Sequence, residues 1–128
     1  MDKKILLVGL VFGILSIVLG AFAAHGLKSK LEVSALQSFE TGVKYQMYMA
    51  LFLLFIAVQT FFPSSVKFHV FWTALLGTLL FSGSIYLLST QAITQINFKK
   101  IGFITPIGGL FMIVSWCIPL IYLITSKK

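Results

Sequence analysis

Residues 5–27, ILLVGLVFGILSIVLGAFAAHGL, contain no Asp, Glu, Lys or Arg. Three more uncharged stretches follow, at residues 45–66, 68–98 and 101–126. Each is long enough to cross a hydrocarbon core of about 30 Å, which takes roughly 20 apolar residues in a helix. A chain of 128 residues could not bury so much apolar surface in a core of its own. The sequence therefore predicts an integral membrane protein.

The composition supports a membrane protein and excludes other classes. Hydrophobic residues make up 59% of the chain and charged residues 10%, whereas about a quarter of a soluble domain is charged. The net charge of +7 comes from Lys, since the chain has no Arg. The lysines flank the apolar runs, where we expect them to contact membrane lipids. Without the planar fork of Arg, binding of nucleic acid is not expected.

The apolar runs and the turn residues between them predict an all-α fold, a four-helix transmembrane bundle. We expect one multi-pass membrane domain over residues 1–128. The predicted spans cover about residues 4–24, 44–62, 67–89 and 101–125.

A short segment between the first two spans has a pattern of its own. Ser34 and Gln37 have the spacing of a capping box at a helix start. Apolar side chains recur on one helical face from Leu36 to Val43. We therefore expect a short amphipathic helix on the membrane surface, which enters the second span near Gly42.

The N-terminus also has features of a signal peptide. Lys3 and Lys4 precede the apolar run, and Ala21-Phe-Ala23 resembles a cleavage site. Cleavage after Ala23 is one interpretation. We favour an uncleaved first span, because the uncharged stretch exceeds the roughly 7–15 apolar residues of a signal peptide.

The orientation depends on a few lysines. An even number of spans puts both termini on one face, and the lysines divide almost equally between the two faces. Lys3 and Lys4 precede the first span, which usually dominates the orientation. We therefore expect a protein of the cell (inner) membrane with cytoplasmic termini.

Small residues recur along one face of the first span, in steps of four, three and four. They are Gly9, Gly13, Ser16 and Gly20. Such a stripe lets another helix backbone approach closely in lipid. The partner is either a helix of the same chain, which we favour, or a second copy or another membrane protein. Gly108 and Gly109 predict a similar contact at the start of the last span.

Polar side chains fall in the half of the membrane that lies away from the termini. They are His25, Tyr45, Gln46, Tyr48, Ser82, Ser84, Tyr86 and Thr105. Polar groups at this depth cost free energy unless they are paired or line water. Two interpretations remain open: a small pocket that opens on that face, or interhelical hydrogen bonds, which we favour. Both predict that these side chains are neighbours.

The sequence offers little for catalysis, cofactors or metals. By residue type His25 is a candidate proton carrier or metal ligand, but the only other histidine, His69, lies at the opposite end of the predicted bundle. No Asp or Glu occurs from residue 45 to 126, which argues against a proton-coupled exporter. Motifs of hydrolases and nucleotide-binding proteins are missing. We expect no enzyme, no cofactor and no metal site.

Five motifs occur in an order that resembles a known family. They are GAFAAHGL at residues 20–27, ETGVKYQMY at 40–48, LFSGSIY at 80–86, TPIGG at 105–109, and Trp116. Together they resemble the small bacterial membrane proteins called Domain of Unknown Function Four-Two-Three. The resemblance implies four membrane helices and no established activity. In this family Gly is usual at Ala23 and His is common at Met49, so a histidine-based metal site is less expected here.

Three function hypotheses follow from these observations. The favoured one is a non-enzymatic helical bundle that binds a lipid or a partner membrane protein. The alternative is an oligomer that transports a small solute or lets it permeate. An enzyme that uses His25 is the weakest.

Overall fold

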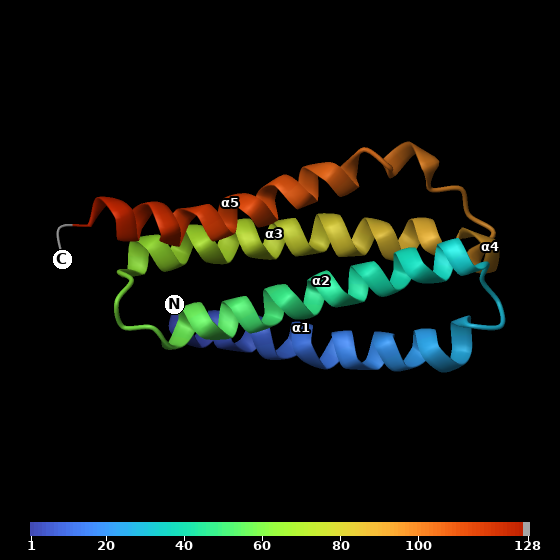
Figure 1. Ribbon diagram of the computed structural model, residues 1–128, viewed down its shortest axis with the longest axis horizontal. Coiled ribbons are helices and arrows are strands. Elements are labelled where there is room, and N and C mark those ends of the chain that lie inside the picture. Colours follow the sequence, from blue (N-terminus) through green and yellow to red (C-terminus); the bar gives the residue numbers. More distant parts are fainter. Residues whose placement is uncertain (127–128) are drawn as a thin grey trace.

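The computed structural model describes residues 1–126 and confirms the all-α fold, with four long helices side by side (Figure 1). The long helices are α1 (Asp2–Phe22), α2 (Val33–Val58), α3 (Ser64–Ser89) and α5 (Ile104–Thr125). The short elements are the π-helical turn η1 (Ala23–Leu27), which continues α1, and α4 (Gln91–Thr94) with the 3-10 turn η2 (Lys99–Ile101), which lie between α3 and α5. The end that carries Met1 and Thr125 is called the terminus end, and the opposite end the loop end.

The long helices follow one another in space in the order α1, α2, α3, α5. The main contacts join α1 with α2, α2 with α3, and α3 with α5. Figure 1 shows α1 and α5 at opposite edges of the molecule. The bundle is therefore an open layer, and α2 and α3 are its interior helices.

The buried core and the outer surface are both apolar. The most buried large side chains belong mainly to α2 and its neighbours, and they include Ile5, Leu53, Ile56 and Val70. Large apolar side chains such as Ile17 and Leu110 point outward. Within the described residues, four helices are long and apolar enough to cross a membrane. Four such helices with an apolar outer surface are what a membrane-spanning bundle requires.

The predicted amphipathic helix on the membrane surface is wrong. Its residues form the first turns of α2, which runs through Gly42 without a break. Their apolar face packs on the protein: Phe39 is buried, and its ring centroid lies 4.9 Å from that of Tyr86. A surface helix and a helix that packs on a neighbour share one pattern, because both need a single apolar face. A lone glycine costs only about 1 kcal/mol in a helix and does not end it.

Other helix boundaries differ by a few residues from the predicted spans. The second helix ends at Val58, because Gln59 has an extended backbone (φ −76°, ψ 127°). Glu32 occupies the N-cap position of α2, and no side chain caps this helix end, so the predicted capping box at Ser34 is wrong. The last helix begins at Ile104, after η2.

A buried lysine joins three helices at the terminus end. The side chain of Lys67 is only 6% exposed, and its Nζ lies 3.0 Å from Oδ1 of Asp2 at the start of α1. The same ammonium donates a hydrogen bond of 3.1 Å to the carbonyl oxygen of Ala57, in the last turn of α2. A cation is stabilised at a helix C-terminus. This pair cannot be predicted from the sequence, because Lys67 flanks an apolar run in the same way as the lysines expected to contact lipid headgroups.

Candidate functional site

The small-residue stripe of α1 faces α2 within the same chain. A Cβ atom on Gly9 would lie 2.9 Å from Cδ2 of Leu54 and 3.2 Å from the carbonyl oxygen of Ala50. Gly13 is less crowded, since its Cβ would lie 3.9 Å from that of Ala50. Farther along the stripe, Ser16 is fully buried and Gly20 packs near Val43. The stripe thus makes an internal contact, as the favoured interpretation expects.

Helices α3 and α5 approach each other even more closely, at Gly77 and Gly108. A Cβ on Gly108 would lie 2.9 Å from the carbonyl oxygen of Gly77, and closer still to the backbone nitrogen of Phe81. Gly109, grouped with Gly108 in the sequence analysis, has room, since its Cβ would lie 3.6 Å from the Phe81 ring. Sequence reasoning missed Gly77, although Ala74 lies three residues before it and a pair of small residues one turn apart is a signal for close helix packing.

Some of the predicted polar residues form a hydrogen-bond network across α1, α2 and α3. Gln46 is 5% exposed, and its Nε2 donates to the carbonyl oxygen of Phe12 at 2.9 Å. The hydroxyl of Tyr86 donates to Oε1 of Gln46 at 2.7 Å. Ser82 donates to the carbonyl oxygen of Gly42 at 2.8 Å. These bonds satisfy polar groups that lipid could not, and they connect three helices.

The remaining predicted polar residues lie elsewhere, so one shared pocket for all eight is wrong. Ser84 hydrogen-bonds Thr105 between α3 and α5. His25 is exposed on η1, and its imidazole makes no hydrogen bond with any described residue. Tyr45 and Tyr48 are exposed on another face of α2. The direction of a span predicts the depth of a residue but not the side of the helix on which it lies.

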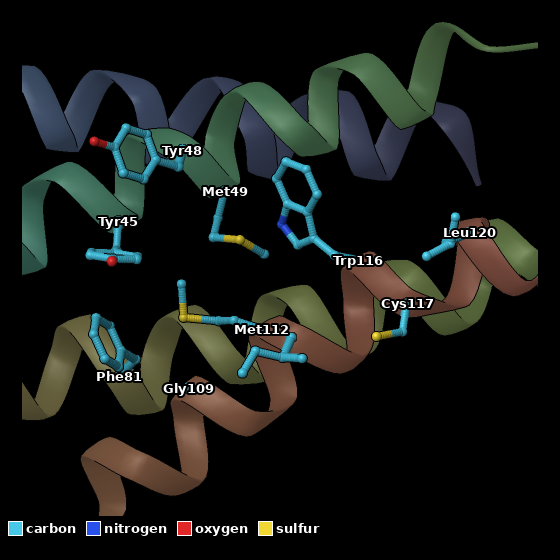
Figure 2. A pocket seen from close by; sticks show the side chains of 10 residues that line it. Tyr45, Tyr48, Met49, Phe81, Gly109, Met112, Trp116, Cys117 and Leu120 are labelled. Carbon is cyan, nitrogen blue, oxygen red and sulfur yellow. The ribbon is translucent and has the colours of Figure 1, made fainter.

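Both tyrosines line a groove between α2 and α5, with α3 as its floor (Figure 2). This part of the groove has a volume of about 720 Å³. Its lining residues are Tyr45, Tyr48 and Met49 of α2, Phe81 of α3, and Gly109, Met112, Ile113, Trp116, Cys117 and Leu120 of α5. Figure 2 shows the side chains of Met49 and Met112 pointing into the space between the helices. The lining is therefore mainly apolar and aromatic.

A second cavity of about 670 Å³ continues toward the terminus end and shares Tyr48, Trp116 and Leu120 with the first. Between the two cavities the ring of Trp116 stacks on that of Phe52, with centroids 4.4 Å apart and an interplanar angle of 11°. We call the two cavities together the α2–α5 groove. Sequence reasoning missed it, although aromatic residues at helical spacing from Tyr45 to Phe55 are a signal for it.

The chemistry of the α2–α5 groove suits an apolar ligand. Its lining offers two tyrosine hydroxyls, one indole N–H and one thiol, and no acid, lysine or histidine. Small-molecule sites have volumes of about 300–1,000 Å³. Within residues 1–126, no three His, Cys, Asp or Glu side chains are grouped so that they could hold a metal ion.

The fold and the groove define a multi-pass helical membrane protein with an apolar cavity open on its side. The chain belongs to the family described as protein of unknown function (DUF423), which matches residues 19–109. This confirms the family resemblance drawn from the motifs.

Two relatives illustrate the similarity. The chain is 40% identical over 116 residues to the UPF0382 membrane protein YwdK of Bacillus subtilis, and the aligned region covers 89% of this chain and 90% of the relative. It is 31% identical over 130 residues to the UPF0382 inner membrane protein YgdD of Escherichia coli, and the aligned region covers 99% of this chain and 94% of that relative. No solved structure matches the chain.

Proposed function

We propose that this protein is a non-enzymatic lipid-binding protein of the membrane, and that its α2–α5 groove holds the acyl chain of a lipid. The observation that carries the proposal is the apolar, aromatic lining of a groove that follows two neighbouring helices. Acyl chains are long and flexible, so they can follow such a groove past the Phe52–Trp116 stack.

A helix of a partner protein fits this groove less well than an acyl chain. Helices associate in lipid through small residues that let their backbones meet. The α2–α5 groove is lined mostly by bulky side chains such as Phe55 and Trp116. The small-residue positions Gly9, Gly77 and Gly108 already make contacts within the chain.

Transport of a small solute by an oligomer is the alternative, and it has less support. The polar side chains at membrane depth, such as Gln46 and Tyr86, bind each other instead of lining the groove. The oligomeric state in nanodiscs tests this alternative. A stable oligomer that conducts a small solute would favour transport over lipid binding.

We further propose that both termini lie in the cytoplasm, as Lys3 and Lys4 ahead of α1 favour. Ser29→Cys at the loop end and Ser65→Cys at the terminus end form a matched pair of exposed positions. With Cys117 replaced in both, an impermeant thiol reagent added outside should label only Ser29→Cys. Labelling of only Ser65→Cys would reverse the orientation.

The lipid-binding proposal is tested by filling the groove. Leu120 lines both cavities, and its neighbour Ile121 lies on the outer surface with nearly the same exposure, 55% and 57%. We expect Leu120→Trp to reduce the lipid that stays bound through purification in mild detergent, as counted by native mass spectrometry. The matched Ile121→Trp variant should retain as much lipid as the unmodified protein. Equal retention by the two variants would contradict the proposal.

A further inference from the structure

We infer that the lipid in the α2–α5 groove is an anionic phospholipid whose phosphate binds Lys44. This inference rests on the proposed function and specifies the headgroup that the same site recognises. Its basis is the position of one lysine, which differs from the position of every other lysine that the structure describes.

Lys44 lies on α2 beside the loop-end part of the groove. It precedes Tyr48 by four residues, so the two side chains occupy neighbouring positions on one side of the helix. Tyr48 lines both cavities of the groove. The Lys44 side chain is therefore placed at the margin of the groove, next to a tyrosine that faces the ligand.

Lys44 also lies at membrane depth. Its neighbour Val43 packs against Gly20 of α1, which is followed by seven more uncharged residues up to Leu27. At a rise of 1.5 Å per residue, the backbone of Lys44 lies about 10 Å inside the loop end of that run. A charged side chain at this depth is costly unless it finds a partner. Lysine extends its apolar stem along the protein and brings its ammonium to the headgroup region.

The ammonium of Lys44 has no partner among the described residues. The side chain is exposed, and the ion pair of Asp2 is with Lys67 at the opposite end. Glu40 lies one turn earlier on α2 without forming an ion pair with Lys44. Lys28, Lys30, Lys99 and Lys100 precede or follow the long helices, outside the groove. Charge complementarity therefore favours an anionic headgroup beside Lys44 over a zwitterionic one.

The two tryptophans of the chain provide the test. Trp116 lies in the groove, whereas Trp72 is exposed on α3 outside it. The Trp72→Phe variant leaves Trp116 as the only tryptophan, and Trp116→Phe leaves Trp72 as the reporter of ordinary lipid contact. Each is placed in phosphatidylcholine vesicles with the same small fraction of brominated phosphatidylglycerol or brominated phosphatidylcholine, and quenching of fluorescence is measured.

We expect Trp116 to be quenched more strongly than Trp72, and more strongly by the anionic lipid. The expected preference is about fivefold in relative association, as for one lysine at an anionic surface. Lys44→Gln should abolish this preference, and Lys44→Arg should keep it. Lys28→Gln, at an exposed lysine of the same membrane face, should also keep it.

The outcomes separate the two proposals. If Trp116 is quenched more than Trp72 but equally by both lipids, the groove binds lipid and the anionic inference is wrong. If Trp116 is quenched no more than Trp72, the proposed function itself is wrong. If the preference survives in Lys44→Gln, or if Lys28→Gln also removes it, Lys44 is not the phosphate-binding residue.

Discussion

The two sides of helix α2 pack against their neighbouring helices in opposite ways. Toward α1 it makes a close contact, where Gly9 leaves little space for a methyl group and Gln46 hydrogen-bonds the neighbouring backbone. Toward α5 it presents aromatic side chains, and a groove of two cavities remains between the helices. In lipid, small residues let helix backbones meet, whereas bulky side chains hold them apart. The size of the facing residues thus decides which side of α2 is closed.

Helices α3 and α5 also make a close backbone contact, and this contact shapes the groove. Gly77 and Gly108 bring the two backbones together. One turn later, Met112 already faces the groove that α5 forms with α2. The close contact therefore fixes how α5 lies against the floor of the groove.

The largest effect is expected from breaking the contact between α3 and α5. Gly108→Ala would push a methyl group against the backbone of Gly77 and Phe81, which cannot move aside as a side chain can. We expect a loss of about 1–3 kcal/mol of stability or more. The midpoint of unfolding by sodium dodecyl sulfate in mixed micelles measures it.

Gly109→Ala is the matched control for this prediction. Its added methyl group makes an ordinary contact with the Phe81 ring, so the change in stability should stay within about 0.5 kcal/mol. Equal midpoints for the two variants would show that α3 and α5 do not meet at Gly108.

A smaller effect is expected from removing the polar network on the closed side of α2. Gln46→Leu deprives the Tyr86 hydroxyl and the Phe12 carbonyl of a partner. Interhelical hydrogen bonds in membranes contribute about 0.6 kcal/mol each, so we expect a loss of about 1 kcal/mol in the same titration.

Two variants check that this loss comes from the network. Tyr48→Phe, on the open side of α2, removes a hydroxyl that has no hydrogen bond within the described residues, and should be neutral. Combining Gln46→Leu with Tyr86→Phe should cost less than the sum of the single changes, because the two side chains share one bond. Additive costs would disprove the coupling.

An effect of similar size should distinguish two positions of the α1 stripe. Gly9→Ala brings a methyl group to 3.2 Å from the Ala50 carbonyl oxygen, and we expect it to cost about 1 kcal/mol. At Gly13 the added methyl group has an ordinary contact distance of 3.9 Å, so Gly13→Ala should be neutral. Thermal unfolding in detergent, followed by circular dichroism, compares the two. A greater loss at Gly13 would mean that the stripe faces a different neighbour.

Much of the fold could be predicted from the sequence, but the site could not. Tyr45 and Gln46 are adjacent and lie at the same depth, yet Gln46 is buried against α1 while Tyr45 lines the groove. Successive residues of a helix point about 100° apart, and in a span that is apolar all round the pattern does not mark the inward side. A polar side chain also gives no sign of which helix supplies its hydrogen-bond partner.

The sequence alone predicts a membrane protein, the number of its long helices and their alternating directions, because uncharged runs of about 20 residues or more are stable as helices across lipid. It also predicts the stripe of small residues on α1, since the spacing of Gly9 and Gly13 can be read from the sequence. The three-dimensional packing was needed to show that α2 begins at Val33 without a separate surface helix, and that α2 and α5 leave a groove between them. Burial in lipid fixes the length and depth of each helix, whereas the rotation and pairing of helices depend on how side chains of different helices fit together.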